Sequence, residues 1–186
     1  MVPTQIRITG PHGSPFKLGG PMLVFEGKTL LGTLDPVEVL KDGTEIHIEA
    51  FIPTQVVLNE RRHVGRFLFF EICAYITEHF PQIQAISFAF VRPIDALGRP
   101  AEQAVSRTSA MERIGAVDIT VTPVTLGVHV VSGVWPYSEA NRVALLTALE
   151  EQRALYRDKP IVRPSFARKL RAKLAAFSSR STRESK

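Results

Sequence analysis

The most regular hydrophobic pattern in this sequence lies between Ile46 and Val91. Apolar and polar side chains alternate from Ile46 onward, which predicts a strand over Ile46–Leu58 with one buried face. Pro53 interrupts this strand, and because proline has no N–H to donate, it predicts a bulge or an edge position. The apolar residues that follow recur at helical spacing and predict a helix: Leu68, Phe69, Ile72, Cys73, Ile76 and Phe80. A second apolar strand is predicted over Ala85–Val91, so the centre of the chain should fold as strand, turn, helix and strand.

Short apolar runs separated by turn residues precede this central unit. They predict an antiparallel meander of short strands at Gln5–Thr9, Met22–Phe25, Thr29–Leu31 and Val37–Leu40. No helical pattern occurs before Asn59.

The segment after the central unit predicts further helices and strands. Gly115 is placed to cap a helix over Ala101–Ile114, and Ser138 is placed as the N-cap of a last helix. Two strands are expected between these helices, at Val117–Val121 and Val128–Val134. The predicted fold class is therefore α/β (α+β), with a mixed, mainly antiparallel central sheet flanked by helices.

Composition and charge divide the chain into a body and a tail. The chain has 186 residues, of which 45% are hydrophobic, and a single domain over residues 1–160 is expected. The net charge of +5 is uneven, because residues 161–186 contain eight Lys and Arg but one Glu, which gives the tail +7 and the body −2. A mildly acidic body argues against a nucleic-acid-binding core.

The tail begins with the pattern of a basic amphipathic helix. Its apolar residues fall on one side of a helical wheel and are Phe166, Leu170, Leu174 and Phe177. Such a helix can dock on the body, bind a protein partner, or contact an anionic membrane or a nucleic acid. Residues 178–186 are polar and charged, and we expect them to be disordered.

Three observations favour a cytoplasmic protein. No apolar run approaches the roughly 18 residues of a membrane span, and the N-terminus lacks the pattern of a secretory signal. Cys73 is the single cysteine, so it cannot form an internal disulfide. It falls on the apolar helix face, which favours a buried hydrophobic side chain over a reactive thiol.

A basic turn, RRHVGRF from Arg61 to Phe67, precedes the predicted central helix. Free backbone N–H groups and the positive end of the helix dipole meet at such a position, so the turn is a candidate phosphate site. Arginine suits this task because its guanidinium binds phosphate through two hydrogen bonds. The alternative is an exposed basic turn whose charge offsets Glu60.

The residues VLNERRHVGRF, Val57–Phe67, resemble the pyrophosphate-binding segment of the GNAT superfamily of N-acyltransferases. In that family a valine-ending strand leads into Arg/Gln-x-x-Gly-x-Gly/Ala at a helix start. Arg62 and Gly65 match this pattern, and Phe67 stands where the second glycine or alanine belongs.

Two later segments extend the resemblance to about residues 45–140. MERIGA, residues 111–116, is similar to the end of a family helix. This segment and a second one, VVSGVWPYSEA at residues 130–140, together resemble the acyl-homoserine-lactone synthase branch of the superfamily.

The resemblance implies transfer of an acyl group to an amine from acetyl-CoA or another acyl-CoA, or from an acyl carrier protein. The donor phosphate would contact Arg62, His63, Val64, Gly65, Arg66 and Phe67. The pantetheine arm would lie where the Ile46–Leu58 strand parts from Ala85–Val91. His47 or Glu49 would accept the amine proton through water, and a backbone N–H beside Pro53 would bind the oxyanion. The alternative interpretation of both side chains is the polar face of a half-buried strand.

Other features favour a catalytically inert relative that binds a protein partner or a second copy through its sheet edge or tail. Met111 stands where many family members carry a tyrosine acid, and Phe67 replaces a small residue. The helices that build an acceptor site in related enzymes have no counterpart before Asn59. Glu71 and Glu78 are predicted to form a solvated stripe. The sequence has no zinc-ligand spacing, P-loop, dinucleotide-binding glycine pattern or Gly-x-Ser-x-Gly motif.

Overall fold

A computed structural model describes five stretches of the chain, residues 6–49, 51–54, 64–92, 108–125 and 128–157. Three predictions fall partly or wholly outside the described residues. They concern residues 55–58 of the strand predicted over Ile46–Leu58, residues 101–107 of the helix predicted over Ala101–Ile114, and the tail over residues 161–186.

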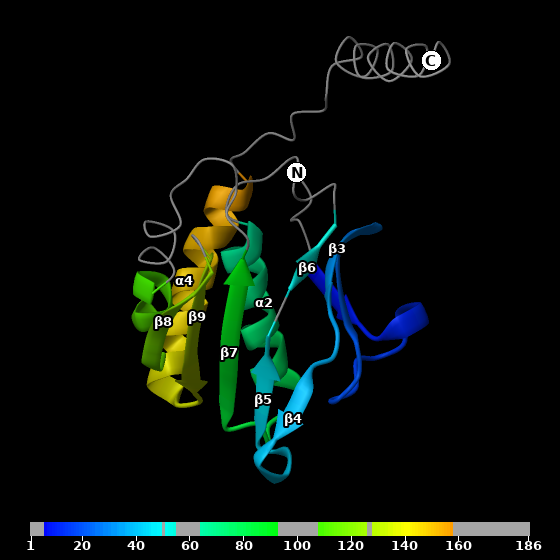
Figure 1. Cartoon of the computed structure of the whole chain (residues 1–186). Coiled ribbons are helices and arrows are strands. Elements are labelled where there is room, and N and C mark those ends of the chain that lie inside the picture. The colour runs from blue at the N-terminus through cyan, green and yellow to red at the C-terminus, as the bar shows by residue number, and fades with distance from the viewer. Residues whose placement is uncertain (1–5, 50, 55–63, 93–107, 126–127, 158–186) are drawn as a thin grey trace, which may run out of the picture.

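The N-terminal part of the chain forms an antiparallel sheet that contains three of the four strands of the predicted meander (Figure 1). The fourth, predicted at Val37–Leu40, pairs in the second sheet instead. Its strands, in spatial order, are β1 (Ile6–Thr9), β2 (Met22–Glu26), β3 (Thr29–Leu34) and β6 (Ile52–Pro53). Among the described strands β6 lies at the edge of this sheet, so the edge position predicted for Pro53 is confirmed.

A second, mixed sheet follows in the chain. Its spatial order is β4 (Glu38–Leu40), β5 (Glu45–Ile48), β7 (Ala85–Arg92), β9 (Val128–Pro136) and β8 (Val117–Thr125). β5 and β7 are parallel, and the other neighbouring pairs are antiparallel. The parallel pair is joined by a helical crossover, as parallel strands require.

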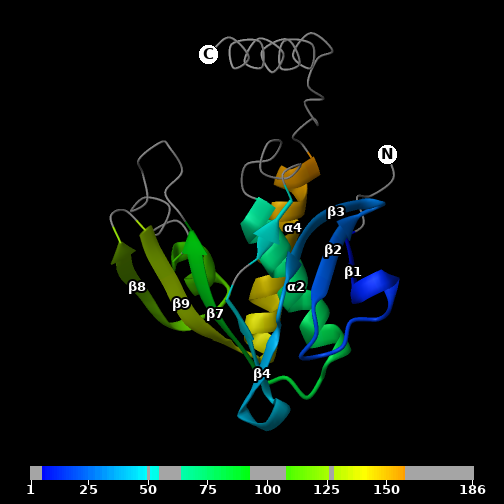
Figure 2. The ribbon, with the colours of Figure 1, turned by 45° about the vertical axis from the view of Figure 1, so that its right-hand side comes forward.

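Two long helices, α2 (Val64–His79) and α4 (Glu139–Arg157), pack against each other behind the mixed sheet (Figures 1 and 2). Figure 2 shows α2 between the two sheets, with the five-stranded sheet on one side and β1–β3 on the other. Residues 108–113 are also helical. The prediction of a mixed, mainly antiparallel sheet flanked by helices is confirmed, with α2 and α4 on the same side of the mixed sheet.

The caps of the later helices are those predicted. Gly115 follows helical residues 108–113 with φ 87°, a left-handed conformation that favours glycine. Ser138 precedes α4, and its Oγ accepts a hydrogen bond of 3.1 Å from the backbone N–H of Asn141. Before α2, the only helical structure among the described residues is two short 3-10 turns, Pro11–Gly13 and Lys41–Gly43.

The mixed sheet has one apolar face and one polar face. Alternate residues of β5, β7 and β9 are fully buried under the helices: Ile46, Ile48, Ile86, Phe88, Val131 and Trp135. Side chains alternate across a strand, so the residues between them point to the opposite face. Cys73 of α2 is completely buried in the core, and this burial raises the pKa of its thiol, which confirms the prediction of an inert side chain.

Candidate functional site

β5 and β7 run side by side and then separate. Parallel pairing joins Glu45–Ile48 to Ala85–Phe88 and stops there. β7 continues to Arg92 paired with β9, whereas the chain after β5 crosses to the other sheet and pairs with β3 as β6. Along one edge of Ala89–Arg92 the backbone groups therefore have no strand partner among the described residues.

Gly32 of β3 provides the space for this crossing. A Cβ atom at Gly32 would lie 2.3 Å from the ring of Phe51 and 2.6 Å from the carbonyl oxygen of Ile52, closer than atoms can approach. The Phe51 ring is half-buried and packs against the core. The backbone N–H of Thr54 then donates to the Leu31 carbonyl at 2.9 Å. The absence of a side chain on β3 thus allows the chain to leave one sheet and join the other.

The start of α2 lies beside the separated end of β7. Figure 1 shows α2 beginning at the end of the molecule toward which β5 and β7 run. The ring of Phe69, in the second turn of α2, lies 5.6 Å from Phe88 and 5.0 Å from Phe90 in edge-to-face contacts. These aromatic contacts place the first turns of the helix next to the part of β7 that β5 leaves.

The first turn of α2 contains four of the predicted donor-binding residues, Val64–Phe67. The first four N–H groups of a helix have no partner within the helix, so this turn presents donors and the positive dipole end. Arg66 is half-buried, and desolvation lowers the pKa of its guanidinium below the ordinary value. Arg62 and His63 lie outside the described residues.

The side chain of Phe67 belongs to the helix interface. It is buried and stacks on Tyr156 of α4, with 4.5 Å between ring centroids. The hydroxyl of Tyr156 donates a 3.0 Å hydrogen bond to Glu26 of β2. Phe67 therefore offers a ligand only its backbone N–H, while its ring anchors the first turn of α2.

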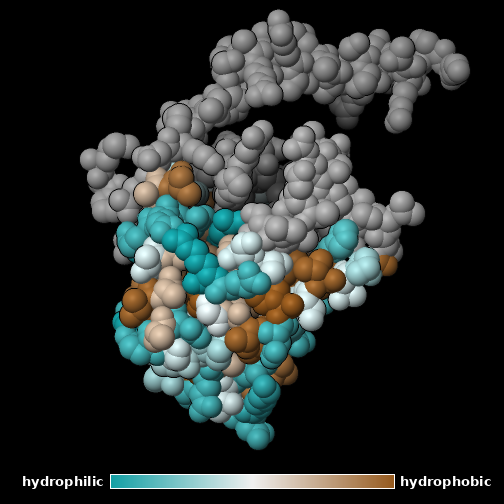
Figure 3. Space-filling model, turned by 90° about the vertical axis from the view of Figure 1, so that its left-hand side faces the viewer, coloured by the Kyte–Doolittle hydropathy of each residue, from teal (hydrophilic) through white to brown (hydrophobic). Residues whose placement is uncertain are grey.

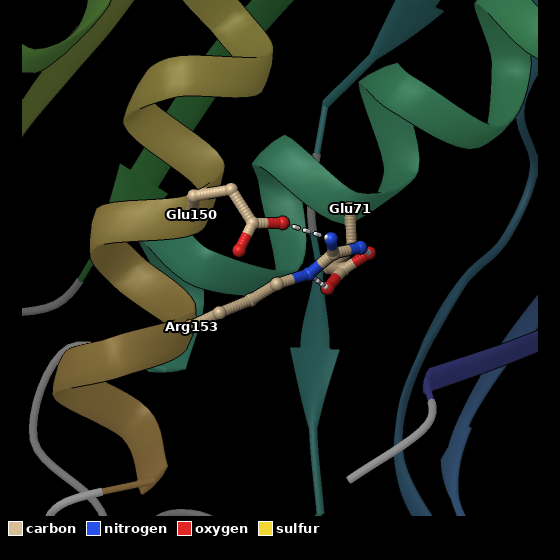
Figure 4. Close-up of polar contacts among 3 residues, drawn as sticks. All are labelled: Glu71, Glu150 and Arg153. Carbon is tan, nitrogen blue, oxygen red and sulfur yellow. Dashed lines mark hydrogen bonds and ion pairs between the residues drawn. The ribbon is translucent and has the colours of Figure 1, made fainter. Parts of the chain in front are cut away.

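An ion-pair cluster fixes the next turn of α2 to α4 (Figure 4). Arg153 of α4 binds Glu71 through two hydrogen bonds, Nε–Oε1 at 2.8 Å and Nη2–Oε2 at 2.9 Å. Its Nη1 also donates to Glu150 at 2.6 Å. Hydrogen bonding to Glu71 is the main reason that the pKa of Arg153 lies above its usual value.

The prediction of a solvated stripe is wrong for Glu71, whose side chain is only 11% exposed. A carboxylate that packs against a neighbouring helix is costly to bury without a partner, and Arg153 of α4 is the partner of Glu71. Glu78 is exposed, as predicted.

The predicted base His47 lies on the polar face of β5. Its ring is half-buried, and Nδ1 lies 3.0 Å from Oγ of Ser87, the residue opposite it on β7. Glu45, on the same face, is buried and forms an ion pair of 2.6 Å with Lys41. Burial on its own would raise the pKa of Glu45, but Lys41, Ser87 and His47 together lower it below its usual value.

The other sequence candidates occupy different environments. Glu49, the second predicted base, follows β5 and is exposed. Met111 is only 2% exposed and belongs to the core. Trp135, in the segment of residues 130–140, is a core residue: it is fully buried and its indole N–H donates to the Ile114 carbonyl at 2.7 Å.

Two residues of this region were missed by the sequence reasoning. Ser87 is a hydroxyl on the polar face of an otherwise apolar strand, which is a weak signal that could have drawn attention to it. Arg153 has a visible partner three residues away, Glu150, but nothing in the sequence points to Glu71 on a distant helix.

Two further findings concern the part of the chain that the structure describes. It contains no group of three or more His, Cys, Asp or Glu side chains arranged to hold a metal ion. None of its helices has the length and apolar character needed to span a bilayer.

Comparison with known proteins gives only distant similarity. No protein-family model and no curated protein matches the sequence. A solved structure of mutant spermidine/spermine N-acetyltransferase SpeG from Vibrio cholerae has 10% identity and a TM-score of 0.49, over 77% of this chain and 98% of that chain. The same enzyme crystallised with CoA and spermine has 12% identity and a TM-score of 0.42, over 65% and 67%. An acetyltransferase from Thermus thermophilus has 12% identity and a TM-score of 0.37, over 63% and 64%. Values this low identify neither a family nor an activity for this chain.

Proposed function

We propose that this protein transfers an acyl group from a coenzyme A or acyl carrier protein thioester to an amine. The observation that carries the proposal is the separation of β5 from β7 directly beside the start of α2. A helix start supplies N–H donors for a phosphate, and the edge of Ala89–Arg92, which no described strand pairs with, supplies backbone groups for an extended, amide-containing arm. The resemblance of residues 57–67 to the pyrophosphate-binding segment of GNAT enzymes supports the same placement.

The proposed site separates the tasks of donor binding and proton transfer. The N–H groups of Val64–Phe67, with Arg62, His63 and Arg66, would hold the donor phosphate. The amine nitrogen attacks the thioester carbonyl, the new C–N bond forms and the C–S bond breaks. His47 or Glu49 accepts, through water, the proton that the amine loses and returns a proton to the sulfur, so that the donor leaves as a thiol. A backbone N–H near Pro53 would stabilise the oxyanion.

The proposal also covers the organisation of the chain. Residues 1–160 form the transferase domain in the cytoplasm, and residues 161–186 are a separate tail that donor binding does not require. The resemblance of residues 111–116 and 130–140 to the acyl-homoserine-lactone synthase branch suggests one specialised form of this reaction.

One observation favours a second candidate, a partner-binding protein without activity. β8, the outer strand of the mixed sheet among the described strands, exposes Val117, Val121 and Val124. On the side of the molecule shown in Figure 3, hydrophobic surface patches lie between hydrophilic ones. An exposed strand of this kind can pair with another chain, either a different protein or a second copy.

A thermal-shift titration with acetyl-CoA and longer acyl-CoA thioesters tests the proposal. A ligand at a hundred times its Kd stabilises the native state by about 2.7 kcal/mol, which is a rise in Tm of roughly 5–10 °C for a chain of this size. Gly65→Glu places bulk and negative charge at the proposed phosphate site and should abolish the shift.

Two control variants accompany that titration. Thr122→Glu adds the same charge at an exposed position on β8, and deletion of residues 161–186 removes the basic tail. Both should keep the wild-type shift. No shift with any acyl-CoA or acyl carrier protein would contradict the proposal and favour the partner-binding candidate.

A further inference from the structure

A buried hydroxyl connects the predicted base to the sheet backbone. Ser87 of β7 is 9% exposed, and its Oγ lies 3.0 Å from Nδ1 of His47 on the neighbouring strand. The Ser87 hydroxyl donates to the carbonyl oxygen of Ile46 at 3.3 Å. Glu45 lies on the same face as His47, and Ser87 is among the groups that lower the pKa of its carboxyl.

The acceptors around Ser87 determine which nitrogen of His47 carries a proton. The carbonyl oxygen of Ile46 can only accept a hydrogen bond, so it takes the single proton of the Ser87 hydroxyl. Oγ then has only lone pairs to offer to His47. With the hydroxyl proton directed to Ile46, the contact of 3.0 Å requires Nδ1–H as the donor to Oγ, which places the lone pair of the neutral imidazole on Nε2.

We propose that Ser87 is a positioning residue that fixes His47 in the Nδ1–H tautomer and leaves Nε2 as the proton acceptor. The inference rests on the proposed function for the role of Nε2 in catalysis, but the tautomer itself follows from the hydrogen bonds alone. In the reaction Nε2 takes one proton from the attacking amine, His47 becomes imidazolium, and Nδ1–H stays bound to Ser87, which neither gains nor loses a proton.

Several charged groups lie around His47 on β4, β5 and the turn between them. Glu45 precedes it on the same face of β5 and Glu38 is opposite it on β4. Glu49 comes directly after β5, and Lys41 forms an ion pair with Glu45. The Ser87 hydroxyl holds the ring in one orientation.

Nitrogen-15 NMR of the full chain with labelled histidines tests the tautomer directly, with His47→Gln used to assign the signals. At a pH where His47 is neutral, the wild type should show Nδ1 protonated and Nε2 unprotonated. Ser87→Ala should move the ring toward the Nε2–H form that free histidine prefers, and Ser87→Thr, which keeps a hydroxyl, should restore the wild-type spectrum. Ser132→Ala removes a hydroxyl of β9 that is bonded to Thr120 at 2.8 Å, and should leave His47 unchanged.

Steady-state kinetics provide the second readout. Ser87→Ala should lower kcat by about tenfold, at the low end of the roughly 10–100-fold typical of residues that orient a functional histidine, and Ser87→Thr should restore it. A wild-type spectrum with Nε2–H, or a tautomer unaffected by Ser87→Ala, would overturn the inference. A correct tautomer in a protein without transferase activity would overturn the proposed function and leave the assignment of His47 intact.

Discussion

The two halves of β7 differ in what surrounds them. Ala85–Phe88 is paired on both edges, with β5 on one side and β9 on the other. Ala89–Arg92 is paired with β9 and has no described strand on its other edge. The same strand therefore continues from the centre of a sheet to an edge, beside the first turns of α2. Stability should depend mainly on the paired half, and ligand binding on the separated half.

The largest expected effect is in the core under the paired half. Ile86 is completely buried, and Ile86→Ala should lower the free energy of unfolding by about 2–5 kcal/mol, through lost burial and the cavity that remains. Urea denaturation measures this change. Ser132→Ala, on the opposite face, should have much less effect, and equal losses would show that the two faces do not differ as described.

Gly32→Ala tests how the chain leaves the mixed sheet. The new methyl group would collide with the Phe51 ring and with the Ile52 carbonyl, so β6 must move away from β3. We expect a loss of about 1–3 kcal/mol in unfolding free energy, together with weaker acyl-CoA binding by calorimetry. Thr33→Ala, at the next position of the same strand pair, should spare donor binding. A Gly32→Ala protein that binds donor normally would contradict the role given to this crossing.

The contact between α4 and the first turns of α2 should have an intermediate effect. Arg153→Met leaves the nearly buried carboxylate of Glu71 without its partner, and we expect a loss of about 1–2 kcal/mol, between the values for exposed and buried pairs. Thermal denaturation checks this. Glu151, on the same helix as Arg153, forms an exposed ion pair with Arg113. Glu151→Gln removes this pair and should leave the unfolding midpoint unchanged.

The smallest effect, and the one that depends on pH, is expected at Glu45 in the paired half. Its pKa in the folded protein is below the usual value, so its ionised form stabilises the native state above the unfolded-state pKa. This contribution should disappear as the pH falls through the folded-state pKa. Glu45→Gln should therefore lower stability by about 0.5–1.5 kcal/mol at neutral pH, and the difference from wild type should shrink in acid. A difference that grows in acid would contradict this account.

The fold was largely predictable because its signals are local. The alternation in β5, the helical stripe of α2 and the caps at Gly115 and Ser138 each involve residues close together in the sequence. The division into two sheets was not predicted, because it depends on Gly32 meeting Phe51 and Ile52 across the molecule.

The candidate site was predictable only in outline. The turn before α2 is a continuous segment, and the position of Gly65 in the first helical turn follows from it. The partner of His47 was not predictable, since Ser87 is brought opposite it by strand register and lies 40 residues away. The ring of Phe67 could not be placed either, because its partner Tyr156 comes from the last helix.

The most direct test of the central claim is a backbone amide NMR titration of the full chain with CoA. We predict that signals of Val64–Phe67 and Ala89–Arg92 shift on binding, while those of Ala85–Phe88 stay nearly unchanged. Shifts confined to other surfaces, such as β8 or the tail, would contradict the claim that the separated half of β7 and the start of α2 bind the donor.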